Sequence, residues 1–170
     1  MEMIIERGLT KSPFCLKMDI IKHIESLISS YIEENDLFIV EISLKPSSRG
    51  LRLLILVDGK PNVTIDQCAF ISKMVGREIE EKGLIDTAYH LEVSSPGMDK
   101  PFKVKEQYIK NVGRVVQVID NEGAEYKGEL LSITDTGILL KKEVAKKGAE
   151  PIETKLSFDQ INKTKLVISF

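Results

Sequence analysis

The spacing of the apolar residues changes near residue 94, and this change constrains the fold more than any other feature of the sequence. Before it, apolar residues recur at helical spacing in two segments, 18–35 and 65–82, and strand-like runs occupy 37–44, 51–57 and 89–94. The resulting order, α-β-β-α-β, predicts an N-terminal α/β domain in which two helices pack on one face of a small sheet.

After the change, the chain consists of short runs rich in strand-forming residues, separated by turns. We predict one helical turn at 105–110 and five strands, at 114–120, 125–133, 138–142, 152–157 and 165–169. Five short strands within about sixty residues are typical of a small SH3-like or Sm-like β-barrel. The predicted fold class is therefore α+β, with a C-terminal five-stranded barrel after the α/β domain.

Local signals indicate where the first two helices begin and end. Asp19 is a candidate cap for the first helix, and the residues at 35–36 favour its end. Thr64 and Gln67 have the spacing of a capping box at the start of the second helix, and Gly83 is suited to its end. We expect the buried face of the second helix to consist of Ile65, Cys68, Ala69, Ile71, Ser72, Val75 and Ile79.

The segment 94–101 connects the two halves and contains two prolines. Pro96 fixes its own φ, and Pro101 disfavours a helical conformation at Lys100. We expect Gly97 to adopt a positive φ, which would turn the chain sharply. Because the prolines restrict the backbone, the segment is expected to be a stiff connector. The predicted organisation is an extension at 1–17, the α/β domain at 18–93, the junction at 94–101 and the barrel at 102–170.

Charge and cysteine content favour a cytoplasmic protein without a membrane anchor. The 170 residues carry a net charge of −2, with 11 basic and 15 acidic residues in 1–92 and 13 basic and 11 acidic in 93–170. Neither half has the strongly positive field of a free nucleic-acid binder. No apolar run approaches the roughly 18–20 residues of a membrane span, and the first residues lack the apolar core of a secretory leader. Cys15 and Cys68 indicate a reducing compartment.

Residue types that carry catalysis are few and scattered in this sequence. His23 and His90 are its only histidines, and neither stands at metal-ligand or catalytic spacing from a cysteine or a carboxylate cluster. Cys68 lies on the apolar side of its predicted helix, where a buried thiol is a poor nucleophile. No glycine-rich phosphate-binding pattern occurs. We therefore predict no catalytic residue, no metal site and no cofactor.

The run LEVSSPGMDKPF at 91–102 resembles the interdomain junction of the RimP family of ribosome maturation factors. The resemblance extends over 18–170, and a Gly-Arg pair at 113–114 resembles the pair that opens the family's barrel. Lys100 stands where the family usually has arginine, so the positive charge is kept while the planar fork of donors is lost. The residues that match the family's motif are Glu92, Ser94, Ser95, Pro96, Gly97, Asp99, Pro101, Gly113 and Arg114.

The resemblance implies a non-catalytic assembly factor that binds the immature small (30S) ribosomal subunit and assists its late maturation. The implied partners are a ribosomal protein, contacted by the C-terminal module, and 16S rRNA of the subunit precursor. No membrane partner is implied, and we expect a monomer. Whether the junction residues contact the ribosome or only shape the backbone stays open at this point.

Two groups of basic residues accompany the predicted barrel. The first precedes and opens it, and the second lies in one strand and the loop that follows. They consist of Lys103, Lys105, Lys110 and Arg114 in the first group, and of Lys141, Lys142, Lys146 and Lys147 in the second. Such side chains neutralise RNA phosphates without reading sequence, so they are candidate rRNA contacts. A solvated surface is the alternative, and the acidic residues at 143 and 150 favour it for the second group.

A second hypothesis is an Sm-like RNA-binding module that works as an oligomeric ring. The run YKGEL at 126–130, followed by Asp135 and the apolar run 138–140, resembles the spacing of an Sm signature. The second Sm signature is missing, and an N-terminal domain would crowd a ring. The mass of the protein in solution separates the two hypotheses, because a hexamer or heptamer favours the ring and a monomer favours the assembly factor.

Overall fold

The computed structural model describes residues 13–142 and 152–168, which divide into two compact units. The first unit comprises the chain up to Leu56 together with Thr64–Ser94. The second comprises the chain from Ser95 onward and the segment Val57–Val63, which contains the end of a strand and the loop after it and is called the loop 57–63 below. In the described ranges, no helix has both the length and the apolar character that crossing a lipid bilayer requires.

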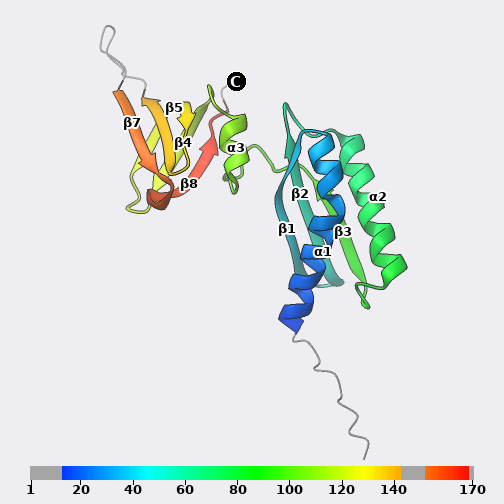
Figure 1. Ribbon diagram of the computed structural model, residues 1–170. Coiled ribbons are helices and arrows are strands. Elements are labelled where there is room, and N and C mark those ends of the chain that lie inside the picture. Colours follow the sequence, from blue (N-terminus) through cyan, green and yellow to red (C-terminus); the bar gives the residue numbers. More distant parts are fainter. Residues whose placement is uncertain (1–12, 143–151, 169–170) are drawn as a thin grey trace, which may run out of the picture. The chain divides into compact units, whose positions relative to one another are not determined.

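The first unit is a three-stranded sheet with two helices on one of its faces (Figure 1). Its elements are α1 (Pro13–Glu34), β1 (Leu37–Ser47), β2 (Gly50–Gly59), α2 (Ile65–Lys82) and β3 (Tyr89–Ser94). The strand order is β1-β2-β3, and β2 and β3 run parallel. α1 packs against β1, and α2 packs against β3. The predicted order of elements, α-β-β-α-β, is confirmed.

Aliphatic side chains fill the space between the helices and the sheet. They recur every four residues on the helices and every two on β2, so each element presents one face to the core. Burying each of them stabilises the unit by about 1.5–3 kcal/mol. The largest fully buried side chains are Ile24, Ile28, Leu53, Ile55, Ile71, Val75 and Ile79.

Helix α1 is longer than predicted, because it begins at Pro13 instead of residue 18. The described residues that were predicted to form an extension are therefore helical. A proline suits the first turn of a helix, where its missing N–H would have no partner. Asp19 consequently lies inside the helix and is not its cap. The helix ends where predicted, next to Asp36, whose φ is 53°. The rest of the predicted extension, 1–12, lies outside the described residues.

Helix α2 begins and ends at the predicted residues. The Thr64 hydroxyl accepts the Gln67 N–H at 3.2 Å, and Gln67 Oε1 accepts the Thr64 N–H at 2.8 Å, which completes the capping box. Gly83 ends the helix with a φ of 57°.

The prediction of the buried face of α2 was wrong at its first turn. Ile65 is 88% exposed and Ala69 is also exposed, while Cys68 and Ser72 are half-buried. The fully buried positions of this helix begin only at Ile71, one to two turns after the cap.

The turn between β1 and β2 is tighter than predicted. β1 extends to Ser47 and β2 begins at Gly50, so the turn occupies 48–49 instead of 46–50. Gly50 has a φ of 107°, and a Cβ there would collide with the carbonyl oxygen of Ala88. Only glycine fits this close approach of two backbone segments.

The second unit is an open five-stranded antiparallel sheet with one short helix. The strand order is β7-β6-β5-β4-β8, so β7 and β8 are its two edges. The predicted five-stranded barrel is therefore corrected to an open sheet, because no ladder joins β7 to β8 in the described residues. The elements are α3 (Lys105–Lys110), β4 (Val115–Asp120), β5 (Glu125–Ile133), β6 (Gly137–Lys142), β7 (Ile152–Ser157), the 3₁₀ turn Phe158–Gln160 and β8 (Ile161–Leu166).

The last strand lies earlier in the sequence than the predicted range 165–169. β8 begins directly after the 3₁₀ turn and pairs with β4, with Thr164 opposite Val118. The sequence INKTKL has no apolar run, because Lys163 and Lys165, both half-buried, alternate with Asn162 and Thr164, so the strand could not be predicted from apolar runs.

Candidate functional site

A polar cavity of about 270 Å³ lies within the second unit. The loop 57–63, the junction after Ser94, helix α3 with the turn that follows it, and the end of β8 form its walls. The cavity brings together six of the residues singled out from the sequence, namely Ser95, Pro96, Gly97, Lys100, Lys110 and Arg114.

The backbone of the junction differs from the prediction at Gly97. Gly97 is not among the described glycines that have a positive φ. The sharp turn forms instead through a hydrogen bond of 2.9 Å from the Lys100 N–H to the Gly97 carbonyl. A Cβ at Gly97 would lie 2.7 Å from Asp99 Oδ1, which belongs to a side chain that can rotate away. A requirement for glycine at this position therefore does not come from backbone strain.

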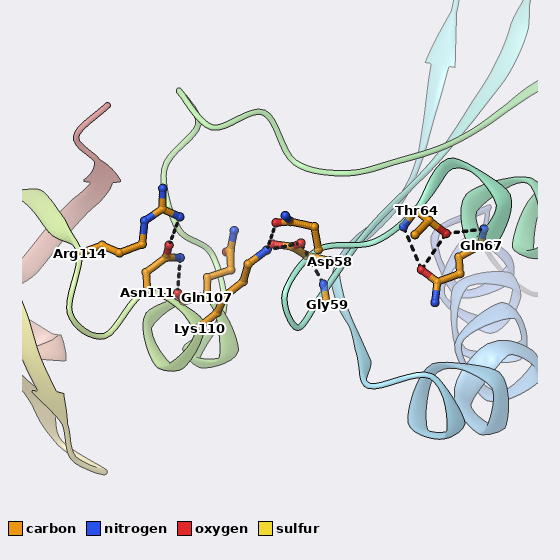
Figure 2. Close-up of polar contacts among 9 residues, drawn as sticks. Asp58, Gly59, Thr64, Gln67, Gln107, Lys110, Asn111 and Arg114 are labelled. Carbon is orange, nitrogen blue, oxygen red and sulfur yellow. Dashed lines mark hydrogen bonds and ion pairs between the residues drawn. The ribbon is translucent and has the colours of Figure 1, made fainter. Parts of the chain in front are cut away.

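Lys110 fixes the loop 57–63 against α3 (Figure 2). Its ammonium group lies 2.7 Å from Asp58 Oδ1 and 2.9 Å from Asn62 Oδ1. The side chains of Lys110 and Asp58 are only 12% and 13% exposed, so this ion pair is shielded from solvent. Breaking it by removing one partner would leave a buried charge without compensation. Lys110 is therefore engaged inside the protein.

Gln107 joins the junction to the start of α3. Its Oε1 accepts the N–H groups of Lys103 at 2.7 Å and of Val104 at 3.3 Å. These groups have no intrahelical partner, so the side chain caps the helix. Gln107 is only 5% exposed, and it lines the cavity.

Asn111 and Arg114 continue the wall of the cavity after α3 (Figure 2). Asn111 is 6% exposed and donates from Nδ2 to the Gln107 carbonyl at 2.7 Å. This bond orients Oδ1 toward Arg114, whose Nη1 lies 3.1 Å away. Gly113 has a φ of 85°, and its N–H donates to the Leu130 carbonyl. Gly113 therefore acts through the backbone, placing Arg114 directly before β4.

The other motif residues do not line the cavity. Glu92 belongs to β3 in the first unit, where it forms a surface ion pair of 2.6 Å with Arg52. Ser94 ends the same strand. Asp99 is exposed, and Pro101 is half-buried just before the start of the second core.

The remaining candidate lysines lie elsewhere. Lys105 forms an ion pair of 2.7 Å with Asp135, and this contact holds the pKa of the Asp135 carboxyl below its usual value. Lys103 contributes its backbone N–H to the cap on α3 and has an exposed side chain. Lys141 and Lys142 lie at the end of β6. Lys146 and Lys147 lie outside the described residues.

Several residues that line the cavity were not predicted from the sequence. Asp58 and Asn62 were interpreted only as turn residues, and Gln107 and Asn111 were not singled out. One signal for Gln107 was present, because it stands at the third position of a short helix, as Gln67 does in α2. No local sequence pattern indicates that Asp58 pairs with Lys110, because the two residues are far apart in sequence.

The site offers hydrogen-bond donors and positive charge, and no reactive group. In the described ranges, no three His, Cys, Asp or Glu side chains form a group that could hold a metal ion. Burial raises the pKa of the Cys68 thiol, which makes it a weaker nucleophile. The arrangement is suited to binding an anion.

Comparisons with known proteins cover both units. Residues 27–99 match the family model of the RimP N-terminal domain. The chain is similar to a ribosome maturation factor RimP from Cytophaga hutchinsonii, with 32% identity over 161 residues. This alignment covers 86% of the present chain and 95% of the relative.

Proposed function

Because the chain belongs to the RimP family of ribosome maturation factors, we propose that it assists the late assembly of the small (30S) ribosomal subunit in the cytoplasm. The observation that carries this proposal is the extent of the similarity. An alignment over 95% of the relative includes both units of this chain, so the relative's role is considered for the whole molecule.

The proposed mode of action is binding without catalysis. A factor that binds one arrangement of a maturing particle more tightly than another shifts the population toward that arrangement without energy input. The cavity supports this proposal, because its walls include hydrogen-bonding and cationic side chains held by caps and ion pairs. A rigid polar surface of this kind suits recognition.

The proposed partners are a ribosomal protein and 16S rRNA of the subunit precursor. An open sheet has two edges, and an extended protein segment can add to such an edge. Lys142, which is exposed, and Lys141, which is half-buried, remain candidates for rRNA phosphates. Lys105 and Lys110 are paired with carboxylates, so each would have to exchange a partner before it could contact a phosphate.

Sedimentation of a cell lysate through a sucrose gradient tests the proposal. At low salt, a tagged copy of the full chain is expected to migrate with small-subunit particles, and depletion of the protein is expected to increase immature small subunits. Migration at the top of the gradient together with normal subunits in depleted cells would contradict the proposed function.

The same preparation tests the expected monomer against the alternative of a ring. Native mass spectrometry of the purified full chain is expected to give the mass of one chain. A hexamer or heptamer would instead favour the Sm-like ring.

A further inference from the structure

We propose that the cavity of the second unit binds a phosphate group of an RNA backbone through Asn62, Lys100, Gln107 and Arg114. This inference rests on the proposed function only for the identity of the RNA. The site itself follows from which hydrogen-bonding atoms of the cavity wall are already used and which are not.

The amide of Gln107 is oriented by its own cap. Two backbone N–H groups donate to Oε1, so this oxygen must face the start of α3 and Nε2 must face away from it. In the described part of the chain, Nε2 of Gln107 has no hydrogen-bond acceptor. Because Gln107 is nearly buried and lines the cavity, the group that it leaves available there is a donor.

Asn62 is oriented in the same way. Its Oδ1 accepts from the Lys110 ammonium at 2.9 Å, which leaves Nδ2 as the unused end of the amide. Lys110 and Asp58 neutralise each other beside it. The loop 57–63 therefore contributes a further hydrogen-bond donor, Asn62 Nδ2, to the wall of the cavity. The ion pair beside it contributes no net charge.

Arg114 supplies the charge. Its Nη1 donates to Asn111 Oδ1, a neutral acceptor, and no described carboxylate forms an ion pair with its guanidinium. Lys100 is the second cation of the wall, and it forms a long, exposed ion pair of 3.7 Å with Asp99. An arginine without a described carboxylate partner favours an anion, because a guanidinium binds phosphate through two parallel N–H groups.

The distribution of these donors favours phosphate over carboxylate. They belong to three separate segments, namely the loop 57–63, the junction and the region from α3 to β4. A tetrahedral phosphate presents oxygens in several directions, whereas a planar carboxylate is satisfied by one arginine fork. Apolar groups of Val63, Met98 and Phe102 also line the cavity and suit the sugar or base next to the phosphate.

Two isosteric substitutions provide the test and its matched control. Gln107→Glu keeps an oxygen to accept both capping N–H groups, but it replaces the free donor by an acceptor with negative charge. Gln67→Glu makes the same change at the same position of α2, where the capping box also accepts glutamate and the residue does not line the cavity of the second unit. Arg114→Gln is a second variant, at an exposed residue whose removal leaves the core unchanged.

The measurements use the full-length chain. Titration with inorganic phosphate is expected to shift the NMR signals of the Gln107 side-chain amide and of Arg114 Nε–H, whereas acetate is expected to shift them little. Binding of a short fluorescein-labelled oligouridylate, followed by anisotropy, is expected to weaken at least about tenfold in Gln107→Glu and Arg114→Gln. Gln67→Glu is expected to stay within about twofold of the wild type.

Other results would overturn the proposal. If Gln107→Glu and Gln67→Glu weaken RNA binding equally, the loss comes from the change in overall charge and not from the cavity. Signal shifts with acetate and an acidic peptide, but not with phosphate or RNA, would assign the cavity to a protein partner. If the wild type co-sediments with small subunits and both cavity variants bind RNA normally, this inference fails while the proposed function stands. If RNA binds in the cavity but the wild type does not co-sediment with small subunits, the proposed function fails while this inference stands.

Discussion

The two units of this protein bury different kinds of side chains. In the described part of the first unit, every buried side chain on the helices and sheet is aliphatic, from Ile24 on α1 to Ile79 on α2. The second unit buries Gln107, Asn111 and Thr164 together with its apolar core. Aliphatic packing tolerates volume-conserving change, whereas a buried polar group is tied to particular partners. The core of the second unit is therefore tied more closely to particular side chains than the core of the first. Two of its buried polar residues, Gln107 and Asn111, line the cavity.

The largest expected effect is the loss of aliphatic packing in the first unit. Ile55→Ala is expected to lower the free energy of unfolding of this unit by about 3–4 kcal/mol, because it removes a fully buried side chain and leaves a cavity. Hydrogen exchange measured by NMR is expected to lose protection in β1–β3 and to keep it in β4–β8. Equal loss in both units would show that the two cores do not respond separately.

A smaller effect is expected where backbones approach closely in the second unit. At Gly128 a Cβ would collide with the carbonyl oxygen of Lys141 on the neighbouring strand, so Gly128→Ala is expected to cost about 2–3 kcal/mol. Gly76→Ala in α2 is the matched control. Its Cβ would lie 3.8 Å from Leu91 Cδ2, an ordinary contact, and alanine favours the helix by about 0.5–1 kcal/mol.

Urea denaturation of both glycine variants checks this contrast. The midpoint is expected to fall for Gly128→Ala and to rise slightly for Gly76→Ala. A fall of similar size in both would mean that helix α2 is packed as tightly at this position as the sheet of the second unit.

The buried polar pair of the second unit gives the next effect. The Tyr108 hydroxyl donates to Thr164 Oγ1 at 2.9 Å inside the core, and burial raises the pKa of this tyrosine. Tyr108→Phe leaves the threonine oxygen without its donor, so we expect a loss of about 1–2 kcal/mol. Adding Thr164→Val is expected to restore part of that loss, because the pair is then apolar on both sides. Equal, additive losses in this double-mutant cycle would contradict a coupled pair.

The same contrast explains how far the sequence could be read. Helix α2 was predicted to the residue, because Thr64, Gln67 and Gly83 are local signals of its ends. The strands of the first unit followed from apolar runs in the same way. Local signals are enough when a core is aliphatic and its elements are regular.

Non-local partners account for what could not be read. The barrel was predicted from the number of strands, but whether the sheet closes depends on whether β7 pairs with β8, which no strand pattern encodes. The cavity was anticipated only in part, through the junction motif. Asp58 and Lys110 are 52 residues apart in sequence, and their ion pair has no sequence signature.

The smallest expected effect is a dependence on pH at the surface of the first unit. Hydrogen bonds from Lys82 first, and then from His23 on α1, hold the pKa of Glu78 below its usual 4.5. A carboxyl with a lowered folded pKa contributes stability above its unfolded pKa, and this contribution is lost as the pH falls through the folded value. The decline below about pH 4.5 is therefore expected to be shallower in Glu78→Gln than in the wild type. Urea midpoints measured across this range check it, with Glu80→Gln as the control on the same helix. An unchanged slope in Glu78→Gln would mean that the contact between α1 and α2 depends on aliphatic packing alone, which would make the difference between the two units sharper still.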